Sequence, residues 1–117
     1  MGKRILVVDD SSIMRKMIKE TLRRGDHEVI GEAKSGEDAV KQYLSLEPDI
    51  VTMDITMRGM DGLAAAREIF KQDKNARIIF LSNLDEKKYG VQALELGAVG
   101  YVNKHKSKKI LDVIDTI

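Results

Sequence analysis

Short apolar runs and amphipathic stretches alternate along the whole chain. The stretches between the apolar runs repeat apolar residues at helical spacing, which predicts helices. Strands that alternate with helices, with connections long enough for crossovers, predict a parallel sheet covered by helices on both faces, that is, an α/β domain. The apolar runs have the length and composition of buried strands, and they cover residues 5–8, 29–33, 50–54, 78–81 and 99–103.

Capping residues indicate where the predicted helices begin. Ser12 is the expected cap of the first helix, Ser35 and Asp38 form a capping box before the second, and Ser107 caps the last. The fourth helix is the weakest, because Gly90 lowers its propensity. The expected apolar positions are Met14, Met17, Ile18 and Leu22, with Arg15, Lys16, Lys19, Glu20 and Arg23 on the opposite face; Ala39, Val40, Tyr43 and Leu44; Leu63, Ala66, Ile69 and Phe70; Val91 and Leu94 within residues 85–96; and Ile110, Leu111, Ile114 and Ile117.

Polar and charged residues follow four of the predicted strands directly. Asp9 and Asp10 come after the first strand, and Asp54 ends the third. Ser82 ends the fourth strand, and Lys104 lies just past the fifth. In doubly wound parallel sheets, ligands bind beyond the carboxyl ends of the strands. We therefore expect these five side chains to line one site.

The predicted cluster of carboxylates favours a bound cation, because like charges in a small crevice repel one another. Mg²⁺ takes oxygen ligands and usually keeps several waters, so two or three aspartates and one backbone carbonyl are enough to hold it. Asp54 would then be a nucleophile toward phosphorus, while Lys104 and Ser82 supply a cation and a hydroxyl to the transferred group. Each residue alone is an ordinary turn, cap or surface residue. Their placement at four strand ends favours a site.

Composition limits the other classes of function. The 117 residues fit a single domain over residues 1–117. The net charge of +1 and the basic segment 104–109, which has no interleaved aromatic residues, predict no direct binding to nucleic acid. Without cysteine, disulfides and thiolate chemistry are excluded. The sequence has neither a signal peptide nor a membrane span, so we expect a cytoplasmic protein that does not bind membranes.

Five segments carry a more specific signal when they are taken together: ILVVDDSSIMRKMI, GEAKSGEDAV, PDIVTMDITM with GMDG, IIFLSN and GAVGYVNK. In this order and spacing they resemble the receiver domain of two-component response regulators, and in form most of all the stand-alone CheY-like regulators of chemotaxis. The resemblance covers essentially the whole chain. It implies a doubly wound (βα)5 fold with the strand order 2-1-3-4-5, which receiver domains share with flavodoxin.

The resemblance also implies a role for each residue of the predicted site. Asp54 matches the aspartate that accepts a phosphoryl group from the phosphohistidine of a sensor histidine kinase. Asp9 and Asp10 match the acidic pair that holds Mg²⁺, with Asp10 the more direct ligand. Asp54 and the main-chain carbonyl of Thr56 match the remaining protein ligands. Lys104 matches the lysine that pairs with phosphate.

Two further residues match the part of the family that transmits the signal. Ser82 matches the hydroxyl that moves toward the phosphoryl group, and Tyr101 matches the aromatic switch that turns inward. The surface of the fourth helix, fifth strand and fifth helix would then change its affinity for a downstream protein, with the flagellar motor switch as a candidate. We expect a phosphorelay protein that catalyses only its own phosphorylation and dephosphorylation. We expect a monomer, with a phosphorylation-linked dimer as the alternative.

Three residues depart from the family pattern. Arg58 stands in the loop after the acceptor where proline is common, and Asn83 stands where a small residue commonly follows the switch hydroxyl. His105 replaces the proline that commonly follows the lysine. Because a cis bond before a residue other than proline costs about 3 kcal/mol, we expect the Lys104–His105 bond to be trans or strained.

Other functions stay open beside the receiver. A phosphatase of haloacid-dehalogenase type would need a second carboxylate two residues beyond its nucleophile, where this chain has Thr56. A flavodoxin-like FMN carrier would bring the flavin phosphate against Asp9 and Asp10, which would repel it. The remaining alternatives are a receiver-like interaction module that is never phosphorylated, and a receiver from a longer regulator with a transcriptional or enzymatic output.

Overall fold

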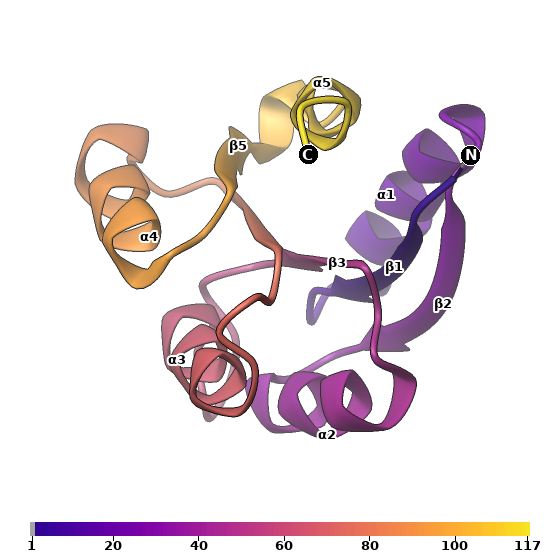
Figure 1. The fold of residues 1–117 in the computed structure, drawn as a ribbon. Coiled ribbons are helices and arrows are strands. Elements are labelled where there is room, and N and C mark those ends of the chain that lie inside the picture. The colour runs from indigo at the N-terminus through magenta and orange to yellow at the C-terminus, as the bar shows by residue number, and fades with distance from the viewer. Residues whose placement is uncertain (1) are drawn as a thin grey trace.

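The structure is a computed structural model that describes residues 2–117; Met1, the first residue of the predicted domain, lies outside the described residues. Five parallel strands form one sheet in the order β2-β1-β3-β4-β5, with helices on both faces (Figure 1). The predicted α/β class and strand order are therefore confirmed. The strands are β1 (Arg4–Val8), β2 (Glu28–Ala33), β3 (Ile50–Met53), β4 (Ile78–Ser82) and β5 (Gly100–Asn103). The helices are α1 (Ser12–Arg24), α2 (Gly36–Leu46), α3 (Gly62–Gln72), α4 (Val91–Leu96) and α5 (Lys109–Ile114), with a π-helical turn η1 (Glu86–Gly90) and a 3-10 turn η2 (Lys104–Lys106).

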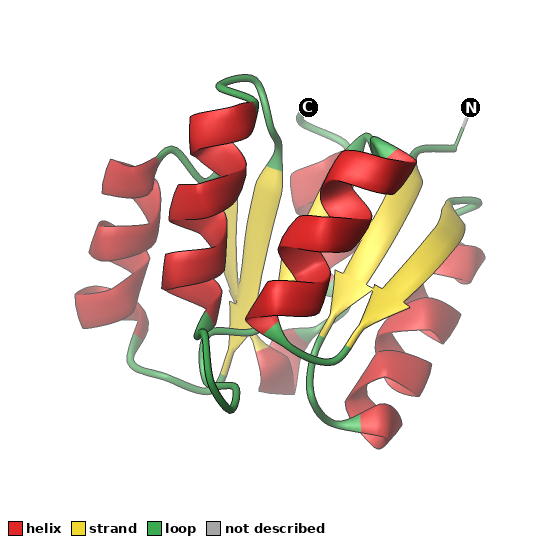
Figure 2. Cartoon of the chain, turned by 90° about the horizontal axis from the view of Figure 1, so that it is seen from below, coloured by secondary structure: helices red, strands yellow, loops and turns green. Residues whose placement is uncertain are grey.

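Two apolar layers hold the helices to the sheet, one on each face. Helices α2, α3 and α4 cover one face, where Ile69 and Phe80 are fully buried. Figure 2 shows α2 and α3 in front of the strands. Helices α1 and α5 cover the other face, with Ile18, Leu22 and Ile110 in its core. Because β3 and β4 are buried along their whole length, their sequences are continuous apolar runs rather than alternating ones.

The first two helices are capped by serines, but one predicted cap is wrong. The residue that caps α1 is Ser11, whose extended backbone lets its Oγ accept from the amide three residues on (3.2 Å). Ser12, the predicted cap, is already inside the helix. Ser35 caps α2 as predicted and accepts from the Asp38 amide (3.1 Å). The Asp38 carboxylate accepts from Gln42 Nε2 (2.9 Å), in place of the predicted return bond to Ser35.

The start of α5 also differs from the prediction. Ser107 has a helical backbone and does not cap α5 with its side chain. The cap function moves upstream, where Asn103 Oδ1 accepts from the His105 amide (2.8 Å) and starts the turn η2. The chain therefore leaves β5 through a capped 3-10 turn that contains Lys104. The Lys104–His105 peptide bond is trans, as predicted.

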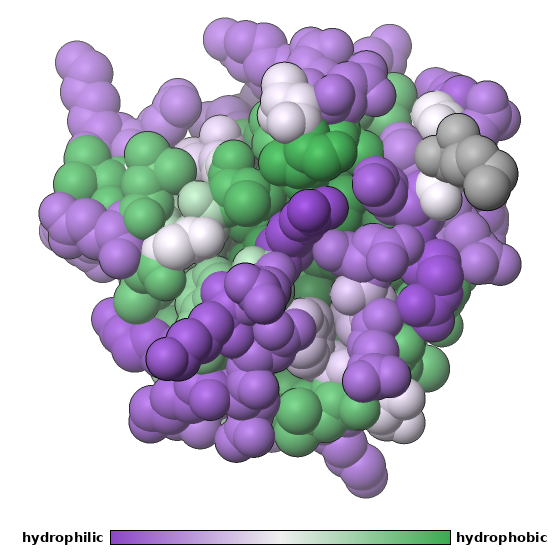
Figure 3. Space-filling view, in the orientation of Figure 1, coloured by the Kyte–Doolittle hydropathy of each residue, from purple (hydrophilic) through white to green (hydrophobic). Residues whose placement is uncertain are grey.

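Four residues predicted to face the core are instead exposed. Met17 on α1, Leu44 on α2, and Val91 and Leu94 on α4 are between 48% and 59% exposed. Each lies on the flank of its helix beyond the strip that touches the sheet, and the buried side of α4 is formed by Ala93. Figure 3 shows apolar surface over α4, at the left of the view.

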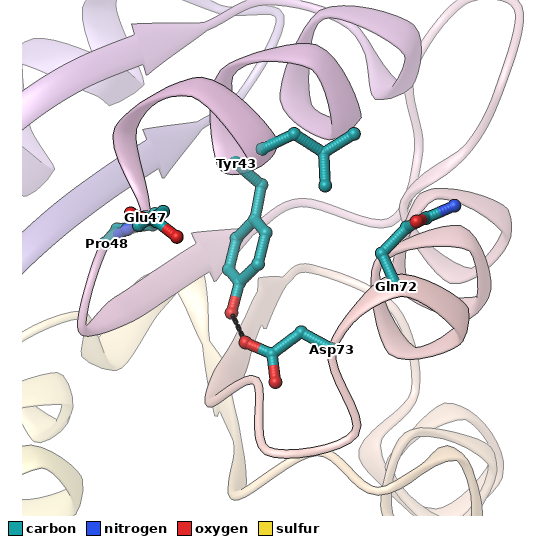
Figure 4. A pocket seen from close by; sticks show the side chains of 6 residues that line it. Tyr43, Glu47, Pro48, Gln72 and Asp73 are labelled. Atoms are coloured by element: carbon teal, nitrogen blue, oxygen red, sulfur yellow. Dashed lines mark hydrogen bonds between the residues drawn. The ribbon is translucent and has the colours of Figure 1, made fainter.

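At the end of the sheet opposite the predicted site, a partly buried hydrogen bond joins α2 to the end of α3. Tyr43 of α2 donates from its hydroxyl to Asp73 Oδ2 at the end of α3 (2.7 Å; Figure 4). Burial, and then Asp73, raise the pKa of the Tyr43 hydroxyl, so it stays a donor. The bond borders a cavity of about 280 Å³ that Leu44, Glu47, Pro48 and Gln72 also line. Within residues 2–117, no helix has both the length and the apolar character needed to cross a membrane.

Candidate functional site

Four neighbouring strands bring the predicted residues to one end of the sheet. Asp9 follows β1, Asp54 follows β3, Ser82 ends β4 and Lys104 follows β5. Parallel pairing keeps these ends level: the amide after β3 donates to the last carbonyl of β1 (3.0 Å), and β4 and β5 stay paired to their final residues. The side chains that follow the strands therefore emerge next to one another.

Three carboxylates form the acidic part of this site. Oxygens of Asp9, Asp10 and Asp54 all lie within 4.8 Å of one another. Asp9 and Asp54 are buried, with 1% and 5% of their surface exposed, whereas Asp10 is exposed at the mouth. Thr56 lines the same cavity of about 300 Å³, together with Asp10, Asp54, Ser82, Asn83, Leu84 and Lys104. Of the residues that line it, Asp10, Thr56 and Asn83 are exposed to solvent.

Lys104 lies between the two buried carboxylates. Its Nζ is 2.9 Å from Asp9 Oδ2 and 3.2 Å from Asp54 Oδ2, and its side chain is 12% exposed. The contact with Asp9 is an ion pair without the alignment of a hydrogen bond, so Asp9 Oδ2 is buried with no hydrogen-bond donor among the described residues. This direct pairing between the strand ends was not predicted from the sequence. It explains how two buried carboxylates are tolerated side by side.

The same neighbours shift the pKa values of this ion-paired group. Burial, followed by the charge of Asp9, raises the pKa of Asp54 from 3.8 to about 6, although Lys104 opposes the change. For Lys104, burial favours the neutral amine, but Asp9 and Asp54 outweigh it and raise the pKa of the ammonium. At neutral pH, Asp54 is therefore mostly a carboxylate that faces a protonated lysine.

The loop after β4 connects the two residues that were predicted to act as switches. Ser82 is buried, and its Oγ accepts a hydrogen bond from the Leu84 amide (3.1 Å). Tyr101 is half-buried, and its hydroxyl donates to the Leu84 carbonyl (2.9 Å). Ser82 thus contacts the amide of Leu84 and Tyr101 contacts its carbonyl, so both side chains bind the backbone of the same residue. Leu84 therefore links the two side chains through one residue of the loop.

The loop after Asp54 is fixed closely against the site. The Gly62 amide donates to the Ile55 carbonyl (2.8 Å), and Asp61 caps α3 through the Ala64 amide (2.8 Å). A Cβ on Gly62 would overlap the Asp54 carbonyl oxygen, so this position accepts only glycine without movement of the backbone. The beginning of α3 therefore sets the position of the Asp54 backbone.

Arg15 and Glu32 belong to the surroundings of the site but were missed in the sequence. Arg15 Nη1 donates to the Asp9 carbonyl (2.8 Å), and its Nε donates to Glu32 Oε1 (3.1 Å). Lys19 Nζ contacts the other oxygen of Glu32 (2.9 Å). Helical spacing places Arg15 on the polar face of α1, and nothing in the sequence pattern relates it to a carbonyl of β1.

The acidic cluster fits a magnesium ion in its donors. The available ligands are oxygens, as Mg²⁺ prefers, and Asp10 lies at the exposed mouth through which an ion would enter. The buried Asp9 Oδ2 already pairs with one cation, the Lys104 ammonium at 2.9 Å, and has no hydrogen-bond donor among the described residues. Asp9, Asp10 and Asp54 are therefore the residues that could hold the metal, with Thr56 at the rim.

Comparison with known proteins identifies relatives along nearly the whole chain. Residues 5–115 match the response regulator receiver domain. The chemotaxis protein CheY of Thermotoga maritima is 46% identical over 89% of this chain and 87% of that protein. CheY of Bacillus subtilis is 41% identical over 98% of this chain and 97% of its own length. The solved CheX-CheY-BeF3-Mg²⁺ complex from Borrelia burgdorferi has a TM-score of 0.90, with 35% identity over 97% of this chain and 87% of that one.

The matched family agrees with the fold and with the acidic end of the sheet. The strand order agrees with a flavodoxin-like fold, and the receiver match and the CheY relatives describe a signalling protein. A phosphatase of haloacid-dehalogenase type is not favoured, since Thr56 stands where its second carboxylate would be. The chain belongs to the response regulator receiver family, as a CheY-like receiver domain of the chemotaxis type in two-component signalling.

Proposed function

We propose that residues 1–117 form one receiver domain in which Asp54 accepts a phosphoryl group from the phosphohistidine of a sensor histidine kinase. What supports this role above all is the Asp54 carboxylate itself, buried at the end of β3 beside the Lys104 ammonium and two further aspartates. The pKa of about 6 leaves it ionised, and so nucleophilic, at neutral pH.

The transfer exchanges one bond to phosphorus for another. An oxygen of Asp54 bonds to phosphorus while the bond from phosphorus to the histidine nitrogen breaks; that nitrogen keeps the electron pair and takes up a proton. Dephosphorylation breaks the bond between Asp54 and phosphorus as a water oxygen attacks, which releases inorganic phosphate. Mg²⁺, held by Asp9, Asp10, Asp54 and the Thr56 carbonyl, would neutralise the phosphoryl oxygens. Lys104, whose Nζ is 3.2 Å from Asp54 Oδ2, stabilises the same negative charge.

The phosphoryl group also gives Ser82 a new partner. Its Oγ now accepts from the Leu84 amide, and donation to a phosphoryl oxygen would draw the hydroxyl away from that loop. Because the Leu84 carbonyl holds Tyr101, the loop and the aromatic ring would move together. A nearly complete switch needs about 5.5 kcal/mol, so Ser82, Lys104 and Tyr101 must contribute jointly.

The surface that responds is the α4, β5 and α5 face. It lies directly next to the loop at Leu84, and Val91 and Leu94 expose apolar side chains from α4. We propose that a downstream protein, with the flagellar motor switch as a candidate, binds this face with an affinity set by phosphorylation. The solved complex of CheY with CheX from Borrelia burgdorferi supports the binding of a partner protein by such a domain. The protein would act as a monomer, unless phosphorylation itself drives dimerisation.

Intact-mass measurement after incubation with acetyl phosphate and Mg²⁺ tests the proposed acceptor. We expect wild type to gain one acid-labile phosphoryl group, and Asp54→Asn to gain none. Asp26→Asn is the matched control, because Asp26 is an exposed aspartate just before β2, at the end of the sheet opposite the site, and should be modified like wild type. If wild type gains no phosphoryl group while its fold is intact, the chain is an interaction module that is not phosphorylated. If Asp54→Asn gains as much as wild type, the acceptor lies elsewhere.

A further inference from the structure

We propose that Arg15 is a positioning residue for the magnesium ligands: it fixes the peptide between Asp9 and Asp10, and Glu32 holds Arg15 in place. This role rests on the proposed function, because the ligands concerned belong to the same magnesium site. It assigns a task to the charged group on α1 and β2 that the phosphorylation chemistry leaves unused.

The backbone on both sides of Asp9 is held by hydrogen bonds. The Asp9 amide donates to the Ala33 carbonyl of β2 (3.0 Å), as the last ladder bond of β1. The Asp9 carbonyl, which belongs to the peptide bond leading to Asp10, accepts from Arg15 Nη1 (2.8 Å). The Asp9 side chain is held as well, because its Oδ1 accepts from the Ser11 amide (2.9 Å). The Arg15 bond is thus the side-chain contact made to the Asp9–Asp10 peptide itself, beside the turn that the Ser11 amide closes over Asp10.

Arg15 can do this because its guanidinium is itself fixed. Its Nε donates to Glu32 Oε1 (3.1 Å) while Nη1 reaches the Asp9 carbonyl, so the rigid fork spans two acceptors at once. Glu32 is anchored in turn by Lys19, which contacts its other oxygen at 2.9 Å. Lys19 first, and then Arg15, hold the pKa of Glu32 below its ordinary value despite partial burial. The Arg15 side chain is only 16% exposed.

Asp10 is the ligand that depends on this arrangement. Among residues 2–117, its carboxylate accepts no side-chain or backbone hydrogen bond that would hold it, and it is exposed. Its place within 4.8 Å of Asp9 and Asp54 therefore follows from the direction of its own backbone. If the preceding peptide is free to rotate, the three oxygens meet less often in a geometry that binds a metal. Loss of partners that orient ligands commonly weakens metal binding 10- to 100-fold.

Electrostatics and positioning predict opposite results when Arg15 is removed. Arg15 is a cation near a site for a cation, so loss of its charge alone would strengthen Mg²⁺ binding. Loss of its hold on the Asp9 carbonyl would weaken binding instead. The direction of the change separates the two, and a purely structural role would change the melting temperature of the metal-free protein without changing Mg²⁺ affinity.

Titration calorimetry of the metal-free full chain with Mg²⁺ tests the role. We expect Arg15→Met to bind Mg²⁺ about 10-fold or more weakly than wild type. We expect Arg15→Lys to fall between the two, because an ammonium keeps the charge but cannot span both acceptors. Lys16→Met is the matched control: it removes one charge from the neighbouring, exposed position of α1 and should bind at least as tightly as wild type.

The outcomes separate failure of this role from failure of the metal site. Equal or tighter Mg²⁺ binding by Arg15→Met, with wild type and Lys16→Met also binding, overturns the positioning role and leaves the proposed function intact. No binding by wild type, matched by Asp10→Asn, overturns the magnesium site itself. If circular dichroism finds Arg15→Met unfolded, Glu32→Gln decides, because it keeps Arg15 but weakens its anchor. Unchanged Mg²⁺ affinity in Glu32→Gln then refutes the role.

Discussion

Replacing Asp54 with asparagine removes a charge from the most crowded part of the site at nearly constant shape. Asp54 is 5% exposed, and burial, with Asp9 next in importance, raises its pKa from 3.8 to about 6. Because one pKa unit corresponds to about 1.4 kcal/mol, the ionised carboxylate costs the folded protein about 3 kcal/mol. That cost already includes the attraction of Lys104. We therefore expect Asp54→Asn to raise the free energy of unfolding by about 2–3 kcal/mol at pH 8 without divalent metal.

The gain in stability should depend on pH in a defined direction. Between the unfolded pKa near 3.8 and the folded pKa near 6, folded wild type binds more protons than the unfolded chain. The stability of wild type therefore falls as the pH rises through this window, whereas asparagine at position 54 does not titrate. The difference between the two proteins should be near zero below pH 4, grow up to about pH 6 and then stay constant.

Urea unfolding followed by far-ultraviolet circular dichroism, with a chelator and at pH values from 4 to 8, measures this difference. The matched control Asp26→Asn changes an exposed carboxylate and should stay within about 0.5 kcal/mol of wild type at every pH. Saturating Mg²⁺ should stabilise wild type but not Asp54→Asn, and so narrow the gap. A variant less stable than wild type at pH 8, or equally stabilised at pH 4 and pH 8, would refute the assigned cost of the charge.

Three further changes test the packing and charge of the same region. Lys104→Met leaves the carboxylates of Asp9 and Asp54 without their cation, so we expect the free energy of unfolding to fall by about 3 kcal/mol at pH 8 without metal. Thermal melts with and without Mg²⁺ should also show that Mg²⁺ stabilises this variant more than it stabilises wild type. Thr52→Val removes a buried hydroxyl that has no hydrogen-bond partner among the described residues and should stabilise the fold by about 1 kcal/mol in urea; a loss of stability would mean that the hydroxyl is hydrogen bonded in solution. Gly62→Ala forces the Asp54 carbonyl to move, so it should lower the free energy of unfolding by about 3 kcal/mol and slow phosphorylation by acetyl phosphate. An unchanged phosphorylation rate would argue against the tight coupling of α3 to the acceptor.

The sequence predicted the order of elements because each strand is buried and each helix is amphipathic. It failed where local pattern does not identify what a helix touches. Val91 and Leu94 repeat at helical spacing, yet α4 meets the sheet through Ala93 and leaves both larger residues exposed. Likewise, adjacent serines at 11 and 12 are equivalent as cap residues in the sequence. The backbone angle of Ser11 decides which one caps α1.

The principle that ligands bind beyond the carboxyl ends of parallel strands accounts for much of the site, but not for the contacts between its side chains. Asp9, Asp54 and Lys104 are recognisable as strand-end residues, and the family resemblance gives each a role. That Lys104 pairs with both carboxylates depends on the turn η2, whose Asn103 cap follows from the local backbone. The approach of Arg15 to the Asp9 carbonyl depends on how α1 lies across the end of β1, which periodicity does not specify.

The position of β5 at the edge of the sheet affects the order in which this protein can fold during its synthesis. The aspartates follow the central strands β1 and β3, whereas the cation that neutralises them follows β5, which is synthesised after both. A nascent chain that has already emerged through β4 has its carboxylates but lacks the lysine. Docking of β5 therefore completes the edge of the sheet and cancels charge at its centre in a single event. Until that event, a cation from solution is the available substitute for Lys104.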